Sequence, residues 1–149
     1  MFTFSQKALL TDLLLIQIDR LEYLNAIPER VWHQYESLES DYVSTKKYCQ
    51  NLYSQILALL SNKKRKDFFP GALYNRWKSS VDELIPQNKV WPIELLPELE
   101  HETINAYKLA ISLSKDEKEL HDLLVEQLQH IKTKSYAFKG IKLMPIKYK

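Results

Sequence analysis

The chain has 149 residues, of which 45% are hydrophobic and 27% charged, enough for one domain with a sizeable buried core. Its 21 lysines and arginines nearly balance 19 aspartates and glutamates, so the charge does not call for nucleic acid or an anionic membrane as partner. Cys49 is the single cysteine, which excludes an intrachain disulfide and a cysteine metal cluster. Two glycines are too few for a fold of many short strands, and long helices are favoured.

The first helix is predicted over residues 5–26. Its leucines recur at helical spacing and form one stripe: Leu10, Leu14, Leu21 and Leu24. Thr11 and Asp12 interrupt the apolar stretch, which indicates a structured helix, neither a signal peptide nor a membrane span. We therefore expect a cytoplasmic protein with no membrane partner.

The second helix is predicted over residues 28–60, with Pro28 at the first helical position, where its missing N–H costs nothing. Its inward residues alternate by four and three without a slip: Val31, Tyr35, Leu38, Tyr42, Thr45, Cys49, Leu52, Ile56 and Leu59. Such a seam is typical of near-parallel packing with a crossing angle of about +20°.

The third and fourth helices are predicted over residues 92–113 and 115–135. The third places these residues inward: Leu96, Leu99, Thr103, Ala106, Tyr107 and Ala110. Ser114 and Glu117 form a capping box, Ser-x-x-Glu, which predicts the start of the fourth helix. The link between the two is nearly nil, so we expect antiparallel neighbours, as for the first two helices.

A long crossover, residues 61–91, separates the two predicted hairpins. Pro70 and Gly71 start a short helix within it that continues to Leu84. Two antiparallel hairpins joined by one long crossover are the connectivity of ferritin-like bundles. We therefore expect an all-α, ferritin-like four-helix bundle over residues 1–135.

The crossover carries a Gly-x-Leu-x-x-x-Trp pattern formed by Gly71, Leu73 and Trp77. Further positions of the same pattern follow in the second predicted hairpin: Glu100, Tyr107, Ala110, Leu123, Leu124 and Gln127. In these residues the chain resembles an uncharacterised family of small bacterial ferritin-like four-helix bundles, over residues 70–131. The resemblance implies the fold and a crossover anchored by Gly71, Leu73 and Trp77, and it implies no established activity.

Ferritin-like bundles often hold two metal ions between inward Glu and Glu-x-x-His side chains. Glu100 falls within the apolar face of the third predicted helix, where an acid is costly unless it is paired, hydrogen-bonded or bound to metal. A tyrosine hydroxyl or a lysine could satisfy it. An altered metal site, for iron or manganese, would be completed from the flanks of other helices by His130, Glu39 and Glu22.

Four polar residues fall on the inward stripes of the predicted helices: Gln17, Thr45, Glu100 and Gln127. We hypothesise that they form one buried polar layer with the seam tyrosines, in place of the metal site of the fold. The favoured function is then non-enzymatic, needs no cofactor and depends on self-association or a protein partner. The alternative is an iron- or manganese-binding ferritin-like protein centred on Glu100.

Three tryptophans are many for one small core, so we expect some to lie at interfaces: Trp32, Trp77 and Trp91. The tail, residues 136–149, alternates apolar and basic residues, and docking or an oligomer contact is expected of it. The run Lys63–Lys66 is interpreted as a solvated helix end, since cations suit the C-terminal helix dipole.

Overall fold

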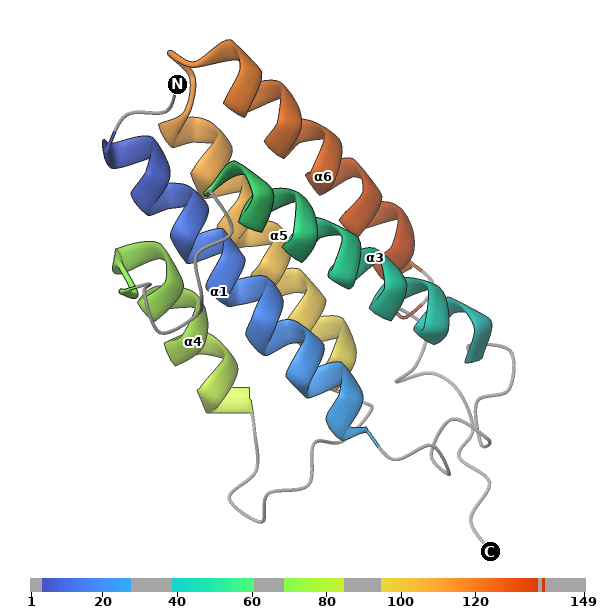
Figure 1. The fold of residues 1–149 in the computed structure, drawn as a ribbon. Coiled ribbons are helices and arrows are strands. Elements are labelled where there is room, and N and C mark those ends of the chain that lie inside the picture. The colour runs from blue at the N-terminus through green and yellow to red at the C-terminus, as the bar shows by residue number, and fades with distance from the viewer. Residues whose placement is uncertain (1–3, 28–38, 61–68, 85–94, 137, 139–149) are drawn as a thin grey trace, which may run out of the picture.

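The computed structural model describes residues 4–27, 39–60, 69–84, 95–136 and 138. These ranges contain five helices and no strand: α1 (Phe4–Ala26), α3 (Glu39–Leu59), α4 (Ala72–Leu84), α5 (Leu96–Leu113) and α6 (Lys118–Tyr136) (Figure 1). The all-α class predicted from the sequence is therefore confirmed for this part of the chain. No helix within it is both long and apolar enough to span a membrane.

The helices lie side by side with alternating directions (Figure 1). α3 runs antiparallel to α1, and α6 runs antiparallel to α5, while α4 runs in the same direction as α1. α1 packs against α3, α4 and α5, and α6 packs against α5 and α3. α4 lies against both α1 and α5, so it covers the line along which these two helices meet.

α1 is buried around most of its circumference. All six residues from 12 to 17 are buried, and Leu13, Leu14 and Ile16 are fully inaccessible. A helix that is buried around most of its circumference needs neighbours on several sides, and α3, α4 and α5 supply them. The simple leucine stripe predicted from the sequence therefore understated how much of this helix is in the core.

The second predicted helix, 28–60, is described only as α3, from Glu39 to Leu59. Its earlier seam positions, together with Trp32, lie outside the described residues. The remaining seam is buried at Tyr42, Thr45, Cys49, Leu52 and Ile56. The prediction that Leu59 points inward is wrong, because its side chain is 37% exposed. Leu60, just after the helix end, is buried instead, with 7% of its side chain exposed.

The junction between α5 and α6 also differs from the prediction. The Ser114 hydroxyl donates a hydrogen bond to the Ile111 carbonyl oxygen at 3.1 Å, so Ser114 closes α5 and does not open α6. The carbonyl oxygen of Glu117 instead accepts the first backbone hydrogen bond of α6, from His121 N at 2.9 Å. α6 therefore begins at Lys118, three residues after the expected start.

The first turn of α4 is capped by a side chain from another helix. Asp12 of α1 accepts hydrogen bonds from the backbone N–H groups of Gly71, at 2.7 Å, and Tyr74, at 3.3 Å. A carboxylate suits the positive end of the helix dipole and satisfies N–H groups that have no partner within the helix. A Cβ atom at Gly71 would lie 2.7 Å from Asp12 Oδ2, so only glycine permits this approach.

α4 is held further along by Trp77, which is 2% exposed. Its indole Nε1–H donates to the Thr103 hydroxyl of α5 at 3.1 Å. The Tyr74 hydroxyl also donates to Asp19 of α1. Leu73 is 7% exposed. The three residues predicted to anchor the crossover, Gly71, Leu73 and Trp77, therefore all lie at contacts or in buried positions of this segment. Trp77 is consequently a core residue and not the interface residue that the tryptophan count suggested.

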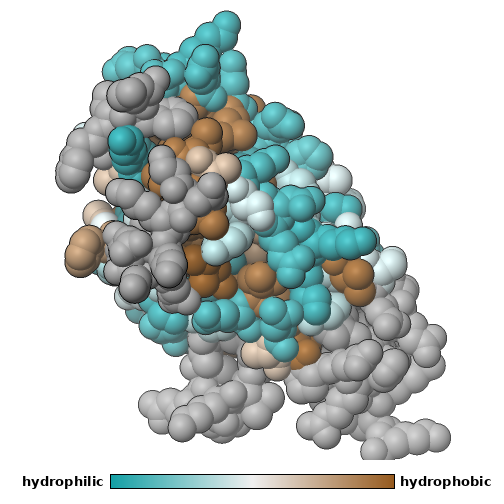
Figure 2. Space-filling model, in the orientation of Figure 1, coloured by the Kyte–Doolittle hydropathy of each residue, from teal (hydrophilic) through white to brown (hydrophobic). Residues whose placement is uncertain are grey.

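Hydrophilic residues cover much of the face seen in Figure 2, with hydrophobic groups interspersed among them. Of the tail, only Tyr136 and Phe138 are described, and the Phe138 side chain is fully buried. The rest of the tail, Trp91 and the run Lys63–Lys66 lie outside the described residues.

Candidate functional site: a buried ion pair and its hydrogen-bonded network

The centre of the molecule contains a buried ion pair between α1 and α5. Arg20 Nη2 lies 2.7 Å from Glu100 Oε1, and Arg20 Nε lies 2.9 Å from Glu100 Oε2, so the guanidinium group holds both carboxylate oxygens. Each side chain is 1% exposed. This is the bidentate geometry in which arginine binds a carboxylate most strongly, and it satisfies the acid that the sequence placed on an apolar face.

A chain of hydrogen bonds extends from the ion pair to the other long helices. Arg20 Nη1 donates to Gln17 Oε1 at 3.0 Å, and Gln17 Nε2 donates to the Tyr107 hydroxyl at 3.0 Å. That hydroxyl donates in turn to Gln127 Oε1 at 3.0 Å, and Gln127 Nε2 donates to Gln55 Oε1 at 3.0 Å. The network therefore links α1, α3, α5 and α6, and we call it the central network.

Cys49 borders the central network from α3. Its thiol lies 3.2 Å from Gln17 Oε1 and 3.3 Å from the Gln17 carbonyl oxygen, and it is fully buried. Burial raises the pKa of the Cys49 thiol, although the nearby Arg20 charge opposes this shift. A neutral, inaccessible thiol is a poor nucleophile, so the arrangement fits the small buried residue expected from the sequence.

The electrostatics of the central network favour fixed protonation states. Burial acts against the charge of Arg20, but the attraction and hydrogen bonds of Glu100 outweigh it and raise the pKa of the guanidinium. For Tyr107, burial itself raises the pKa of the phenol, so the phenol stays protonated at neutral pH. The charges of the ion pair cancel, and every other member is a neutral hydrogen-bonding group, which is a stable arrangement for a buried polar cluster.

All four residues of the predicted polar layer are buried. Gln17, Glu100 and Gln127 belong to the central network. Thr45 is different, because its hydroxyl donates to the Asp41 carbonyl oxygen of its own helix at 2.7 Å. The tyrosine that joins the two amides is Tyr107 of α5, not one of the tyrosines on the α3 seam.

Arg20 and Gln55 are the members of the central network that were not predicted from the sequence. Arg20 lies on a stripe of α1 that alternates by three and four: Leu10, Leu13, Gln17, Arg20 and Leu24. Every residue of this stripe is at most 1% exposed. The signal was therefore present, but a charged residue in an apolar stripe is readily assigned to the surface unless a matching acid is sought on another helix.

The candidate metal ligands do not come together around Glu100. Glu22 of α1 and His130 of α6 are both exposed, and the Glu39 side chain lies outside the described residues. His130 stacks on Tyr48 with ring centroids 4.7 Å apart. Among described residues no group of three or more His, Cys, Asp or Glu side chains could hold a metal ion. The Arg20 guanidinium, which holds Glu100, and the Gln17 amide beside it do not fit the ligand set of a di-metal centre.

The sequence matches no protein-family model, no curated protein and no solved structure. The central network offers a cation, a carboxylate and amides that all satisfy one another, and its nucleophile is buried and neutral. Such an arrangement stabilises and specifies the packing of four helices, and it presents no reactive group to a substrate.

Proposed function

We propose that this chain is a non-enzymatic, ferritin-like four-helix bundle that acts by self-association. The four long helices would be α1, α3, α5 and α6, with α4 as the crossover. This topology is supported by the directions of the helices in Figure 1, in which two antiparallel pairs are separated by a helix that travels back along the bundle.

The observation that supports a non-enzymatic centre without metal is the bidentate contact between Arg20 and Glu100. In a ferritin-like centre, metal cations neutralise inward carboxylates. Here the Arg20 guanidinium supplies the positive charge, binds both carboxylate oxygens and donates one further hydrogen bond, to Gln17. We infer that an internal cation has replaced the metal, so that the centre serves structure.

Exposed apolar side chains along α3 and α6 support an associating surface. Val43 is 49% exposed on α3, and Val125 and Tyr136 are 38% and 72% exposed on α6. α4 covers α1 and α5, which leaves the α3–α6 pair without a covering helix among the described elements. A second copy that covers these side chains would remove apolar surface from water, which is the main driving force for association.

Sedimentation velocity on dilute protein tests this proposal. We expect the wild type to be a dimer or larger, and the double variant Val43→Lys, Val125→Lys to be a monomer. Leu113→Lys is the control, because Leu113 is 66% exposed but lies at the end of α5. A monomeric wild type, or equal dissociation by Leu113→Lys, would contradict the assignment of this surface.

A further inference from the structure

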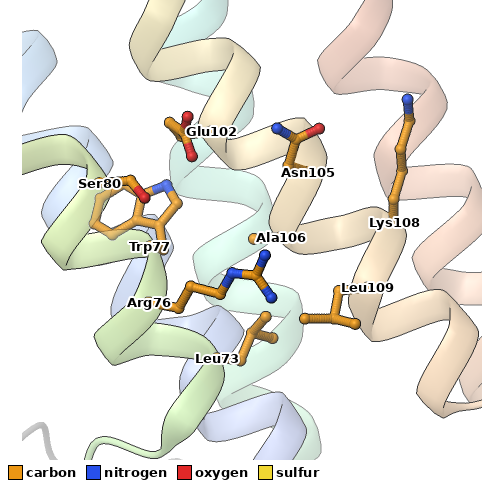
Figure 3. Close-up of a pocket in the computed structure, with 9 residues that line it drawn as sticks. All are labelled: Leu73, Arg76, Trp77, Ser80, Glu102, Asn105, Ala106, Lys108 and Leu109. Carbon is orange, nitrogen blue, oxygen red and sulfur yellow. The ribbon is translucent and has the colours of Figure 1, made fainter.

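A groove between α4 and α5 lies apart from the central network. Its volume is about 580 Å³, within the range of about 300–1,000 Å³ found for small-molecule sites. Each helix lines it with side chains at positions i, i+3, i+4 and i+7. The two facing rows are Leu73, Arg76, Trp77 and Ser80 from α4, and Glu102, Asn105, Ala106 and Leu109 from α5 (Figure 3).

The floor of the groove is apolar and closed. Leu73, Trp77 and Ala106 are 7%, 2% and 6% exposed, and Leu109 is partly buried against the core. Trp77 is fixed by its hydrogen bond to Thr103, so this floor is pre-formed. A pre-formed apolar floor favours an apolar ligand body, because little conformational freedom is lost on binding.

Arg76 supplies a cation directly above this floor. In Figure 3 it reaches from α4 toward α5, and its guanidinium group lies beside Ala106 with Leu73 and Leu109 below it. Among described residues Arg76 forms no ion pair, whereas Lys78 on the same helix pairs with Asp82. A guanidinium over apolar surface, with no carboxylate partner in the part of the chain that the structure describes, is well placed to bind one from outside.

Two further charged residues, Lys108 and Glu102, determine which ligand charge the groove favours at each end. Lys108 stands on its α5 side and adds to the positive potential, and it too forms no ion pair with a described residue. Glu102 lies closer to Ser80 and Trp77 in Figure 3, toward the other end of the groove. A carboxylate is therefore attracted at the Arg76 end, and a second one would be repelled at the Glu102 end.

We propose that this groove binds a small amphiphilic monocarboxylate. The carboxylate accepts two hydrogen bonds from the Arg76 guanidinium, and the apolar body lies on Leu73, Ala106 and Leu109. The site is separate from the Arg20–Glu100 centre and from the α3–α6 surface, so it stands whether or not the chain self-associates.

The test is an NMR titration of the isotope-labelled full chain, in which the backbone amide chemical shifts are followed. The ligand is phenylbutyrate and, separately, its neutral analogue phenylbutanol. We expect saturable shifts at Leu73, Ala106 and Leu109 with phenylbutyrate, and a Kd of about 1 mM, as for a ligand of this size. The alcohol should bind roughly tenfold more weakly, because it cannot accept the charge-assisted pair of hydrogen bonds.

Arg76→Gln should weaken phenylbutyrate binding roughly tenfold and leave phenylbutanol binding unchanged. Lys47→Gln is the matched control, because it removes one positive charge from an exposed position on α3. Equal binding of acid and alcohol, shifts outside the groove, or equal weakening by Lys47→Gln would each overturn the proposal. The comparison of acid with alcohol uses the wild type, so it remains decisive even if Arg76→Gln fails to fold.

Discussion

Arg20 and Glu100 are 80 positions apart in the sequence and meet as an ion pair with both side chains 1% exposed. Removing two charges from water is costly, and only good geometry and further hydrogen bonds offset that cost. Here both carboxylate oxygens are held by Arg20, at 2.7 and 2.9 Å, and Gln17 accepts from a third donor. The ion pair therefore fixes the register between α1 and α5.

Replacing Arg20 with glutamine should be strongly destabilising, because it leaves the Glu100 charge buried without a partner. We expect the free energy of unfolding to fall by about 3–5 kcal/mol, measured by urea denaturation. Arg76→Gln is the matched control, since Arg76 is exposed and its loss should change stability by no more than about 0.5 kcal/mol.

The double variant Arg20→Gln, Glu100→Gln separates the charge effect from the packing effect. With no charge left unpaired, it should be more stable than the sum of the two single losses by about 0.5–3 kcal/mol. Additive losses in this double-mutant cycle, or an Arg20→Gln loss no larger than that of Arg76→Gln, would contradict the buried ion pair.

Tyr107 joins the two amides of the central network, so Tyr107→Phe tests the network beyond the ion pair. The Gln17 Nε2–H and Gln127 Oε1 groups would each lose a partner, and a loss of about 1–3 kcal/mol is expected. Tyr53→Phe removes a hydroxyl from a partly buried site on α3 and should change stability by no more than about 0.5 kcal/mol. Equal effects of the two substitutions on the urea midpoint would count against the network.

Gly71→Ala tests the side-chain cap of α4. The added Cβ would lie 2.7 Å from Asp12 Oδ2, so the carboxylate must move from the N–H groups that it binds. We expect a loss of about 1–3 kcal/mol in thermal or urea unfolding. In an Asp12→Ala background the same change should cost much less, and an unchanged cost there would show that the two residues are not coupled.

The sequence predicted the parts of the fold that depend on local periodicity. α1 and the inward face of α5 follow from helical spacing, and the short α4 follows from Pro70 and Gly71, which precede it. Glu100 and Gln17 were found because they are polar residues on apolar stripes. The partner of Glu100 was not found, because ion pairing between helices far apart in the sequence depends on register, which spacing within one helix does not determine.

Two further features were beyond local reasoning. Ser114 satisfies a capping motif for the helix that follows it, but its hydroxyl instead bonds back to Ile111 of the preceding helix. The cap of α4 comes from Asp12, in another helix, so no motif near Gly71 announces it. In both cases a tertiary arrangement selects between hydrogen-bond partners that the sequence alone leaves equivalent.

Stability should fall at alkaline pH through the half-buried tyrosines. Burial, and then the charge of Glu126, raise the pKa of Tyr48 from 10.0 to about 12. The folded state thus holds the proton more tightly than the unfolded chain, so the stabilisation is complete below pH 10.0 and is lost as the pH rises toward about 12. Tyr48→Phe should reduce this loss of stability. The measurement is the urea midpoint of each protein below pH 10.0 and near pH 12. A native-state absorbance titration with all tyrosines ionising near their ordinary pKa would contradict this expectation.

The metal content of the purified protein shows most directly whether the Arg20 guanidinium stands in place of a metal ion beside Glu100. Protein expressed with added iron and manganese, and purified without chelators, should contain far less than one equivalent of either metal, because the Arg20 guanidinium already holds both oxygens of Glu100. Iron or manganese at one or more equivalents per chain, lost in Glu100→Gln, would contradict the replacement of the metal by Arg20.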